Sequence, residues 1–186
     1  METVTEPWSD LSLHLRPGER LLWAGRPDPA VYFVAGDIFL IPFSIMFAGF
    51  SVFWEATVLV AKAPLLFKLW GLPFVAMGAY LLVGRFVYKQ RTKLRTTYGL
   101  TNQRVLVQIG TRALREAPVH DLETAINRSR DGSHVSLTFG PQSAYGRRYQ
   151  PNSGMDIFSP GSSPLAFFDV ADPEQLLAAL ETAHRG

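Results

Sequence analysis

Two apolar stretches decide the fold: IFLIPFSIMFAGFSVFW at residues 38–54 and LWGLPFVAMGAYLLVG at residues 69–84. Neither contains a charged side chain. A helix that crosses a bilayer needs about 20 mainly apolar residues, because the hydrocarbon core is about 30 Å thick. Extending the two stretches to residues 35–61 and 65–88 gives both that length and leaves a short connector. We therefore predict a membrane α-helical hairpin; the alternative is a pair of buried helices in a soluble protein.

Small residues let membrane helices approach each other closely. At 100° per residue, one stripe of the first stretch is aromatic, and small and polar residues form another about 110° away. The aromatic stripe consists of Phe39, Phe43, Phe47, Phe50 and Trp54. The second stretch also contains small residues. We expect the two helices to pack through Ser44, Ala48 and Ser51 on the first and Gly71, Gly78 and Ala79 on the second.

The charges around the two stretches predict an orientation. Basic residues precede the first stretch and follow the second, and only Lys62 and Lys68 lie between them. Because basic flanks stay in the cytoplasm, both termini should be cytoplasmic, with residues 1–34 as an N-terminal cytoplasmic segment. Glu55 is a carboxylate within the first span, and we expect it near the far surface, within reach of those lysines or of headgroup water.

A soluble β domain is expected over residues 92–184, because the apolar periodicity there changes from helical to alternating. The predicted strands cover residues 96–100, 104–109, 113–117, 122–129, 134–139 and 164–170, with a long loop at 140–163. Asp172, Pro173 and Gln175 then carry the signature of a helix start. The order predicts an α+β domain: an antiparallel bent sheet or partial barrel, with the C-terminal helix capping one open end.

Two short patterns flank the apolar stretches. Residues 15–27 read Leu-x-Pro-Gly-Glu-x-Leu-x-Trp-x-Gly-Arg-Pro, and residues 97–105 read Thr-Tyr-x-Leu-Thr-Asn-Gln-Arg-Val. Together they resemble bacterial membrane proteins that carry a pleckstrin-homology-like (PH-like) domain. The resemblance implies a fold of seven strands and a capping helix, tethered to the bacterial inner (cytoplasmic) membrane by a multi-pass anchor. It implies no known reaction.

Residues for catalysis are lacking in the sequence. The chain has no cysteine, which excludes thiolate catalysis and cysteine-based metal sites. Its four histidines are scattered, so no metal site is expected. Asp121 and Glu123 alternate on one predicted strand and are interpreted as a solvated strand edge. We therefore predict a protein that is not an enzyme and has no cofactor.

Two basic groups suggest binding instead. Lys89, Arg91, Lys93 and Arg95 follow the second span, where anionic headgroups attract basic side chains, although they also serve as the orientation signal alone. The long loop adds Tyr145, Arg147, Arg148 and Tyr149. Two arginines are too few for nucleic acid.

The predicted partners are membrane lipid and a protein partner or a second copy of the chain, with no nucleic acid. The sequence favours a non-enzymatic, membrane-anchored PH-like adaptor that binds a protein or lipid headgroups at the cytoplasmic face. The alternative is an accessory subunit of a larger integral membrane complex, for example a respiratory, photosynthetic or transport complex.

Overall fold

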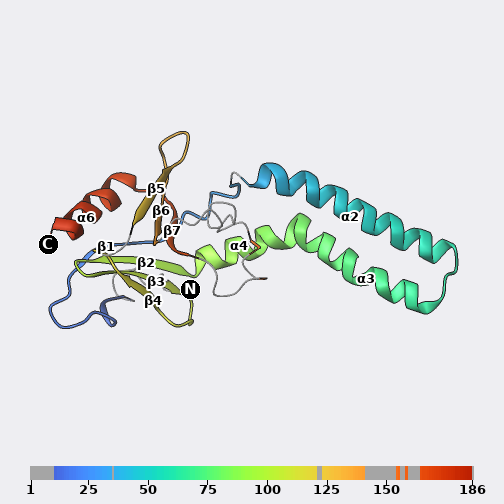
Figure 1. The fold of residues 1–186 in the computed structure, drawn as a ribbon, viewed down its shortest axis with the longest axis horizontal. Helices are drawn as coiled ribbons and strands as arrows, with labels where there is room; N and C mark the ends of the chain where they lie inside the picture. Colours follow the sequence, from blue (N-terminus) through green and yellow to red (C-terminus); the bar gives the residue numbers. More distant parts are fainter. Residues whose placement is uncertain are drawn as a thin grey trace, which may run out of the picture. The chain divides into compact units, whose positions relative to one another are not determined.

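The computed structural model of the chain describes residues 11–34, 36–120, 123–140, 154, 155, 158 and 164–185. They belong to two compact units (Figure 1). The β domain draws on residues 1–31, 91–149 and 161–186, and the helix unit draws on residues 32–90 and 150–160.

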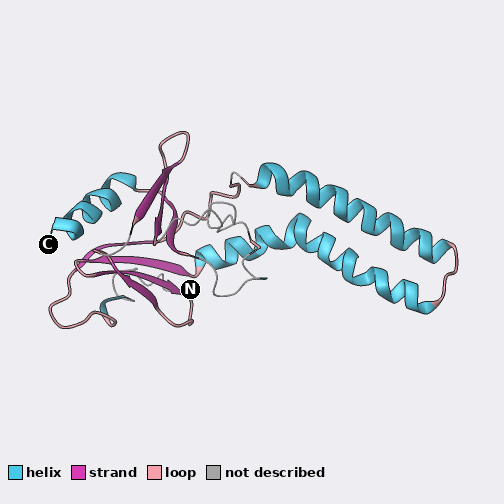
Figure 2. Ribbon diagram, in the orientation of Figure 1, coloured by secondary structure: helices cyan, strands magenta, loops and turns pink. Residues whose placement is uncertain are grey.

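The helix unit is an antiparallel pair of long helices (Figure 2). Helix α2 spans Asp37–Val60, and α3 spans Leu65–Ala79. A π-helical turn, η1 (Tyr80–Gly84), and α4 (Arg85–Leu94) continue α3 without a break. Both helical segments, Asp37–Val60 and Leu65–Leu94, are long and apolar enough to cross a membrane. The prediction of two apolar helices is confirmed, and the second continues beyond its predicted end at residue 88.

The β domain contains two antiparallel sheets, of order β1-β2-β3-β4 and β5-β6-β7. The strands are β1 (Leu21–Gly25), β2 (Thr96–Thr101), β3 (Arg104–Ile109), β4 (Arg115–Pro118), β5 (Thr124–Arg128), β6 (Val135–Phe139) and β7 (Leu165–Val170). Helix α6 (Pro173–Arg185) follows β7. The predicted combination of an antiparallel β domain with a C-terminal helix is therefore confirmed.

Strand β1 lies within residues 1–34, which we predicted to be a segment separate from the β domain. It pairs with β2, with Ala24 opposite Gly99 and Gly25 opposite Tyr98, although both long helices separate the two strands in the chain. The domain is therefore discontinuous and includes more than residues 92–184. Sequence periodicity misses β1 because five residues, of which only Trp23 is buried, make too short a pattern.

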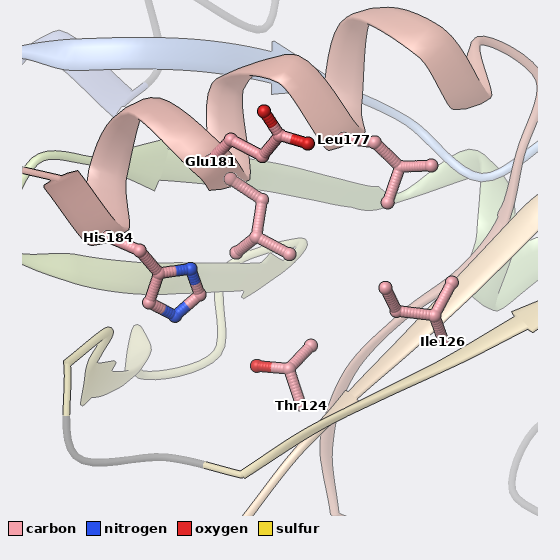
Figure 3. Close-up of a pocket in the computed structure, with 6 residues that line it drawn as sticks. Thr124, Ile126, Leu177, Glu181 and His184 are labelled. Carbon is pink, nitrogen blue, oxygen red and sulfur yellow. The ribbon is translucent and has the colours of Figure 1, made fainter.

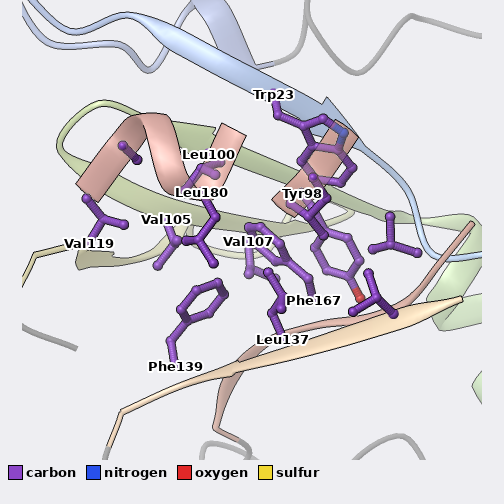
Figure 4. Close-up of a cluster of buried hydrophobic side chains, with 14 residues drawn as sticks. Trp23, Tyr98, Leu100, Val105, Val107, Val119, Leu137, Phe139, Phe167 and Leu180 are labelled. Carbon is purple, nitrogen blue, oxygen red and sulfur yellow. The ribbon is translucent and has the colours of Figure 1, made fainter. Parts of the chain in front are cut away.

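The core of the β domain lies between the two sheets and α6 (Figure 4). Phe167 on β7 is fully buried and stacks on Tyr98 of β2, with ring centroids 4.7 Å apart. Trp23 of β1 packs on the same phenylalanine at 5.7 Å. Leu176 and Leu180 bring the apolar face of α6 onto this cluster. Burial of these side chains stabilises the domain, at about 1.5–3 kcal/mol for each large apolar residue.

Candidate functional site

The two long helices meet along the small residues of their facing sides. Ser44, Ala48 and Ser51 are buried on α2, and Gly71 and Gly78 are buried on α3. A Cβ atom on Gly78 would lie 2.9 Å from the Cα of Ala48, so only glycine allows this approach.

Three side chains of this set have features that the sequence does not indicate: the exposure of Ala79 and the hydrogen bonds of the two serines. Ala79 is exposed and does not belong to the contact. The hydroxyls of Ser44 and Ser51 donate to the carbonyls of Leu40 and Phe47 one turn earlier, at 2.5 and 2.7 Å. Because these bonds stay within α2, the two serines contribute small size to the packing and no hydrogen bond between helices.

Glu55 points at the facing helix. A Cβ atom on Gly71 would collide with its Oε2 atom, so the carboxylate occupies the space that this glycine leaves. Oε2 is buried and accepts no hydrogen bond from any described residue, and neither Lys62 nor Lys68 forms an ion pair with Glu55. The predicted contact with a lysine is therefore absent from the described part of the chain.

The basic segment that follows the second span divides into two sets. Lys89 and Lys93 are buried, with 4% and 3% of their surface exposed, whereas Arg91 and Arg95 are exposed. Residues four apart share a helix face, so the two lysines lie on one side and the two arginines lie on the other. Contact with headgroups is one of the two interpretations that the sequence allows for these four residues, and burial excludes it for the two lysines.

Lys93 ties together segments that are distant in sequence. Its Nζ donates to the backbone carbonyls of Asp28 and Val31, at 3.0 and 2.7 Å, and pairs with the carboxylate of Asp169 at 2.7 Å. Lys89 Nζ donates to the carbonyl of Tyr32 at 2.9 Å. These lysines fasten the chain that leads into α2, and they are not available to a ligand.

A further exposed cation lies beside Arg95. The amide of Gly110 donates to the Arg95 carbonyl at 2.7 Å, which brings the turn between β3 and β4 against this position. Arg112 lies in that turn and is exposed. We call Arg91, Arg95 and Arg112 the arginine patch. The sequence alone does not indicate Arg112 as a member of this patch, because only the strand pairing places its turn next to Arg95.

A buried ion pair joins the start of α2 to the start of α4, at the end of the helix pair away from the connecting turn. The guanidinium of Arg85, 1% exposed, binds the carboxylate of Asp37, and its Nε donates to the Leu81 carbonyl at 2.9 Å. The amide of Val34 donates to the same aspartate at 2.8 Å. Nearby, the Tyr80 hydroxyl donates to the Gly154 carbonyl. In the sequence, Arg85 is one of the basic residues that follow the second stretch, and only the contact between the helices brings it to Asp37.

The long loop is only partly described. Tyr145, Arg147, Arg148 and Tyr149, which the sequence predicted as contacts, lie outside the described residues, and so does Asp121. Glu123 is exposed, as a solvated edge residue would be.

The two sequence patterns meet in one buried network. Glu19 from the first pattern accepts hydrogen bonds from Arg104 and from the hydroxyl of Thr101 in the second, each at 2.7 Å. The backbone amide of Arg16 adds a bond at 2.8 Å, and Arg104 also binds Glu116 on β4. Burial alone raises the pKa of Glu19, but these donors outweigh it and lower the pKa to about 2.

A cleft of about 470 Å³ separates α6 from β5 (Figure 3). Thr124 and Ile126 line it from the strand, and Leu177 lines it from the helix together with Leu180, Glu181 and His184. Ile126 is 50% exposed. Within the described residues, no group of three or more His, Asp or Glu side chains is arranged to hold a metal ion.

Comparisons of the chain with protein-family models, curated proteins and solved structures find no match.

Proposed function

We propose that the helix pair spans a membrane and anchors the β domain at its surface as a non-enzymatic adaptor. The observation that carries this proposal is the exposure of large apolar side chains around both helices. Phe39 on α2 is 80% exposed and Trp70 on α3 is 67% exposed. In the most apolar window of each segment, only 22% and 17% of the residues are buried. Exposing an apolar surface of this extent to water is unfavourable, whereas the hydrocarbon core of a bilayer accommodates it.

The same exposure argues against two core helices of a soluble protein, which would be covered on most sides. The stripe of Phe39, Phe43, Phe50 and Trp54 is exposed, whereas the small residues face α3. A membrane helix pair has this arrangement, with bulky side chains toward lipid and small ones toward its neighbour.

In this proposal, the chain resides in a bacterial inner membrane with both termini in the cytoplasm. The support is the order of basic residues along the chain, which are frequent before the first helix and after the second and sparse between them. A reporter that is active only outside the cytoplasm, fused after Gly186, should stay silent. A fusion in the turn at Lys62 should be active. Activity at the C-terminus would refute this orientation.

We further propose that the β domain is a PH-like module. Among the described residues, its seven strands form sheets of four and three, and one helix follows the last strand. This is the composition that the resemblance implies.

The arginine patch supports an adaptor that works at an anionic surface. Each basic residue near anionic lipid contributes about 1 kcal/mol, so three exposed arginines enrich such lipid around the chain. Leu94, 62% exposed between Arg91 and Arg95, adds an apolar contact at the same surface.

Native mass analysis after gentle detergent extraction tests the adaptor. A monomer or homo-oligomer that retains anionic lipid, and that loses this lipid when Arg91 and Arg95 are replaced by Gln, is the expected result. If the chain instead forms a stoichiometric complex with other membrane proteins, and this complex persists when Arg91 and Arg95 are replaced, the chain is an accessory subunit.

A further inference from the structure

Gly154 and Phe158, from the long loop, lie against the end of the helix pair. The hydroxyl of Tyr80 donates to the carbonyl of Gly154, and the ring of Phe158 meets the ring of Tyr80 edge-on, with centroids 5.4 Å apart. Both loop residues belong to the helix unit, although they lie between β6 and β7 in the chain. This part of the loop is therefore attached to the second long helix.

Two glycines permit this contact. The ring of Tyr80 lies over Gly84, where a Cβ atom would come within 2.7 Å of the Cδ2 atom of the ring. Gly154 has a φ of +82°, and a Cβ atom there would lie 2.5 Å from the carbonyl oxygen of Arg85. A larger residue at either position would displace its neighbour, so the contact depends on both glycines.

The contact lies at one end of the apolar length of the helices. Gly84 is the last residue of the uncharged stretch at residues 69–84, and Arg85 follows it. At the same end, Phe33 packs edge-on against Phe86, with ring centroids 5.9 Å apart. Aromatic side chains gather where headgroups meet hydrocarbon. In the proposed anchor, this end of the helix pair and the attached loop residues lie at that boundary.

Phe158 has the exposure of a side chain that faces lipid. It is 51% exposed, although the ring of Tyr80 covers one of its sides. Val83, in the same π-helical turn as Tyr80, is 63% exposed. The loop sequence from Met155 to Phe158 reads Met-Asp-Ile-Phe, so three of its four side chains are apolar. Transfer of such side chains from water to the edge of the acyl region is favourable.

We propose that this loop segment is a further membrane contact, in which Phe158 inserts among lipids at the boundary between headgroups and acyl chains. The contact with Tyr80 holds the ring at that level, beside the second span. The proposal rests on the proposed membrane anchor and adds a lipid contact outside its two helices.

A nitroxide label tests the location of Phe158. The chain has no cysteine, so Phe158→Cys gives a single labelling position. With the full chain in nanodiscs of phosphatidylcholine and phosphatidylglycerol, electron paramagnetic resonance compares relaxation of the label by oxygen, which dissolves in lipid, and by a water-soluble nickel chelate. Ile126→Cys is the matched control, because Ile126 is 50% exposed but lies on β5. The oxygen-to-nickel ratio should be several-fold higher at residue 158, and equal ratios would overturn the proposal.

A second pair of variants tests the contact that positions the ring. Gly154→Ala should displace the segment from the helix, so the ratio at the labelled residue 158 should fall toward the value at residue 126. Gly132→Ala is the matched control, because Gly132 also has a positive φ but a Cβ atom there would meet nothing within 4 Å. It should leave the ratio unchanged. The proposal fails if Gly154→Ala has no more effect than this control.

Photo-crosslinking keeps an aromatic ring at the tested position. With p-benzoylphenylalanine in place of Phe158, illumination should give covalent adducts with lipid that mass spectrometry detects. The same group in place of Ile126 should give none. Adducts from residue 158 to protein alone would contradict insertion into the bilayer.

A label at Val83→Cys separates this proposal from the anchor itself. If its oxygen-to-nickel ratio is as low as that at residue 126, the second helix does not lie in lipid and the anchor proposal fails. If Val83 is in lipid while Phe158 is in water, the anchor stands and the loop contact is wrong.

Discussion

Glu19 should make the β domain sensitive to acid. Its pKa is lowered from 4.5 to about 2 in the folded chain. The unfolded chain binds a proton at this carboxylate more readily, so the stabilisation is complete above pH 4.5 and is lost as the pH falls toward 2. A difference of this size corresponds to on the order of 3 kcal/mol, a large share of the stability of a small domain.

Replacing the side chain should have a similar effect at neutral pH. Glu19→Gln removes the charge while Arg104, 5% exposed, stays buried. A buried arginine without its carboxylate costs about 3–5 kcal/mol, and Glu116 remains to offset part of it, so we expect a loss of about 2–4 kcal/mol. Glu116→Gln is the matched control. Its side chain is 37% exposed, so its loss should cost less than 1 kcal/mol.

The assay is hydrogen exchange of β2 and β3, followed by mass spectrometry on the full chain in nanodiscs across pH. The exchange free energy of these strands should fall between pH 5 and 2 in the native chain, and fall less in Glu19→Gln, with known pH effects on intrinsic exchange removed. If Glu116→Gln costs as much as Glu19→Gln, or if the two pH profiles are parallel, Glu19 does not hold the network as described.

Two further contrasts test the packing. Gly78→Leu should push α2 and α3 apart, which costs about 1–3 kcal/mol and lowers the thermal midpoint of the detergent-solubilised chain. The control is Gly49→Leu, whose side chain would enter open space and should leave the midpoint unchanged. Equal midpoints for the two variants would refute the close contact. Lys93→Met removes the ammonium group that pairs with the partly buried Asp169 carboxylate and donates to two backbone carbonyls, so urea unfolding of the β domain should show a loss of about 2–4 kcal/mol. Arg91→Met should change it by less than about 0.5 kcal/mol, and a comparable loss there would contradict the division of the basic segment into buried and exposed faces.

The elements that could be predicted are those whose pattern is local and repeated. The apolar stretches carry their signal in every residue, and the alternation of Val105 and Val107 marks β3 without reference to any other strand. The start of α6 was similarly readable, because Pro173 and the residues beside it form the cap within one turn.

The candidate sites depend on contacts between distant segments, which periodicity does not encode. Lys89 and Arg91 look alike in sequence, and only the course of the chain near Tyr32 makes one buried and the other exposed. The partner of Glu19 is Arg104 on β3, and only the pairing of β1 with β2 brings these two residues together. The charge of a side chain could therefore be read from the sequence, but its availability to a ligand could not.

The pairing of β1 with β2 would give the proposed membrane anchor a role in assembly of the β domain. In the sequence, both helices come between these two strands. Both must therefore be synthesised before β1 can pair with β2. In the proposed membrane topology, the strands lie on the same side when both helices have crossed and on opposite sides when only one has. A chain with one helix misplaced would leave Trp23 on the opposite side from Phe167, without the core that the two residues share. In that topology, completion of the β domain depends on the insertion of both helices together.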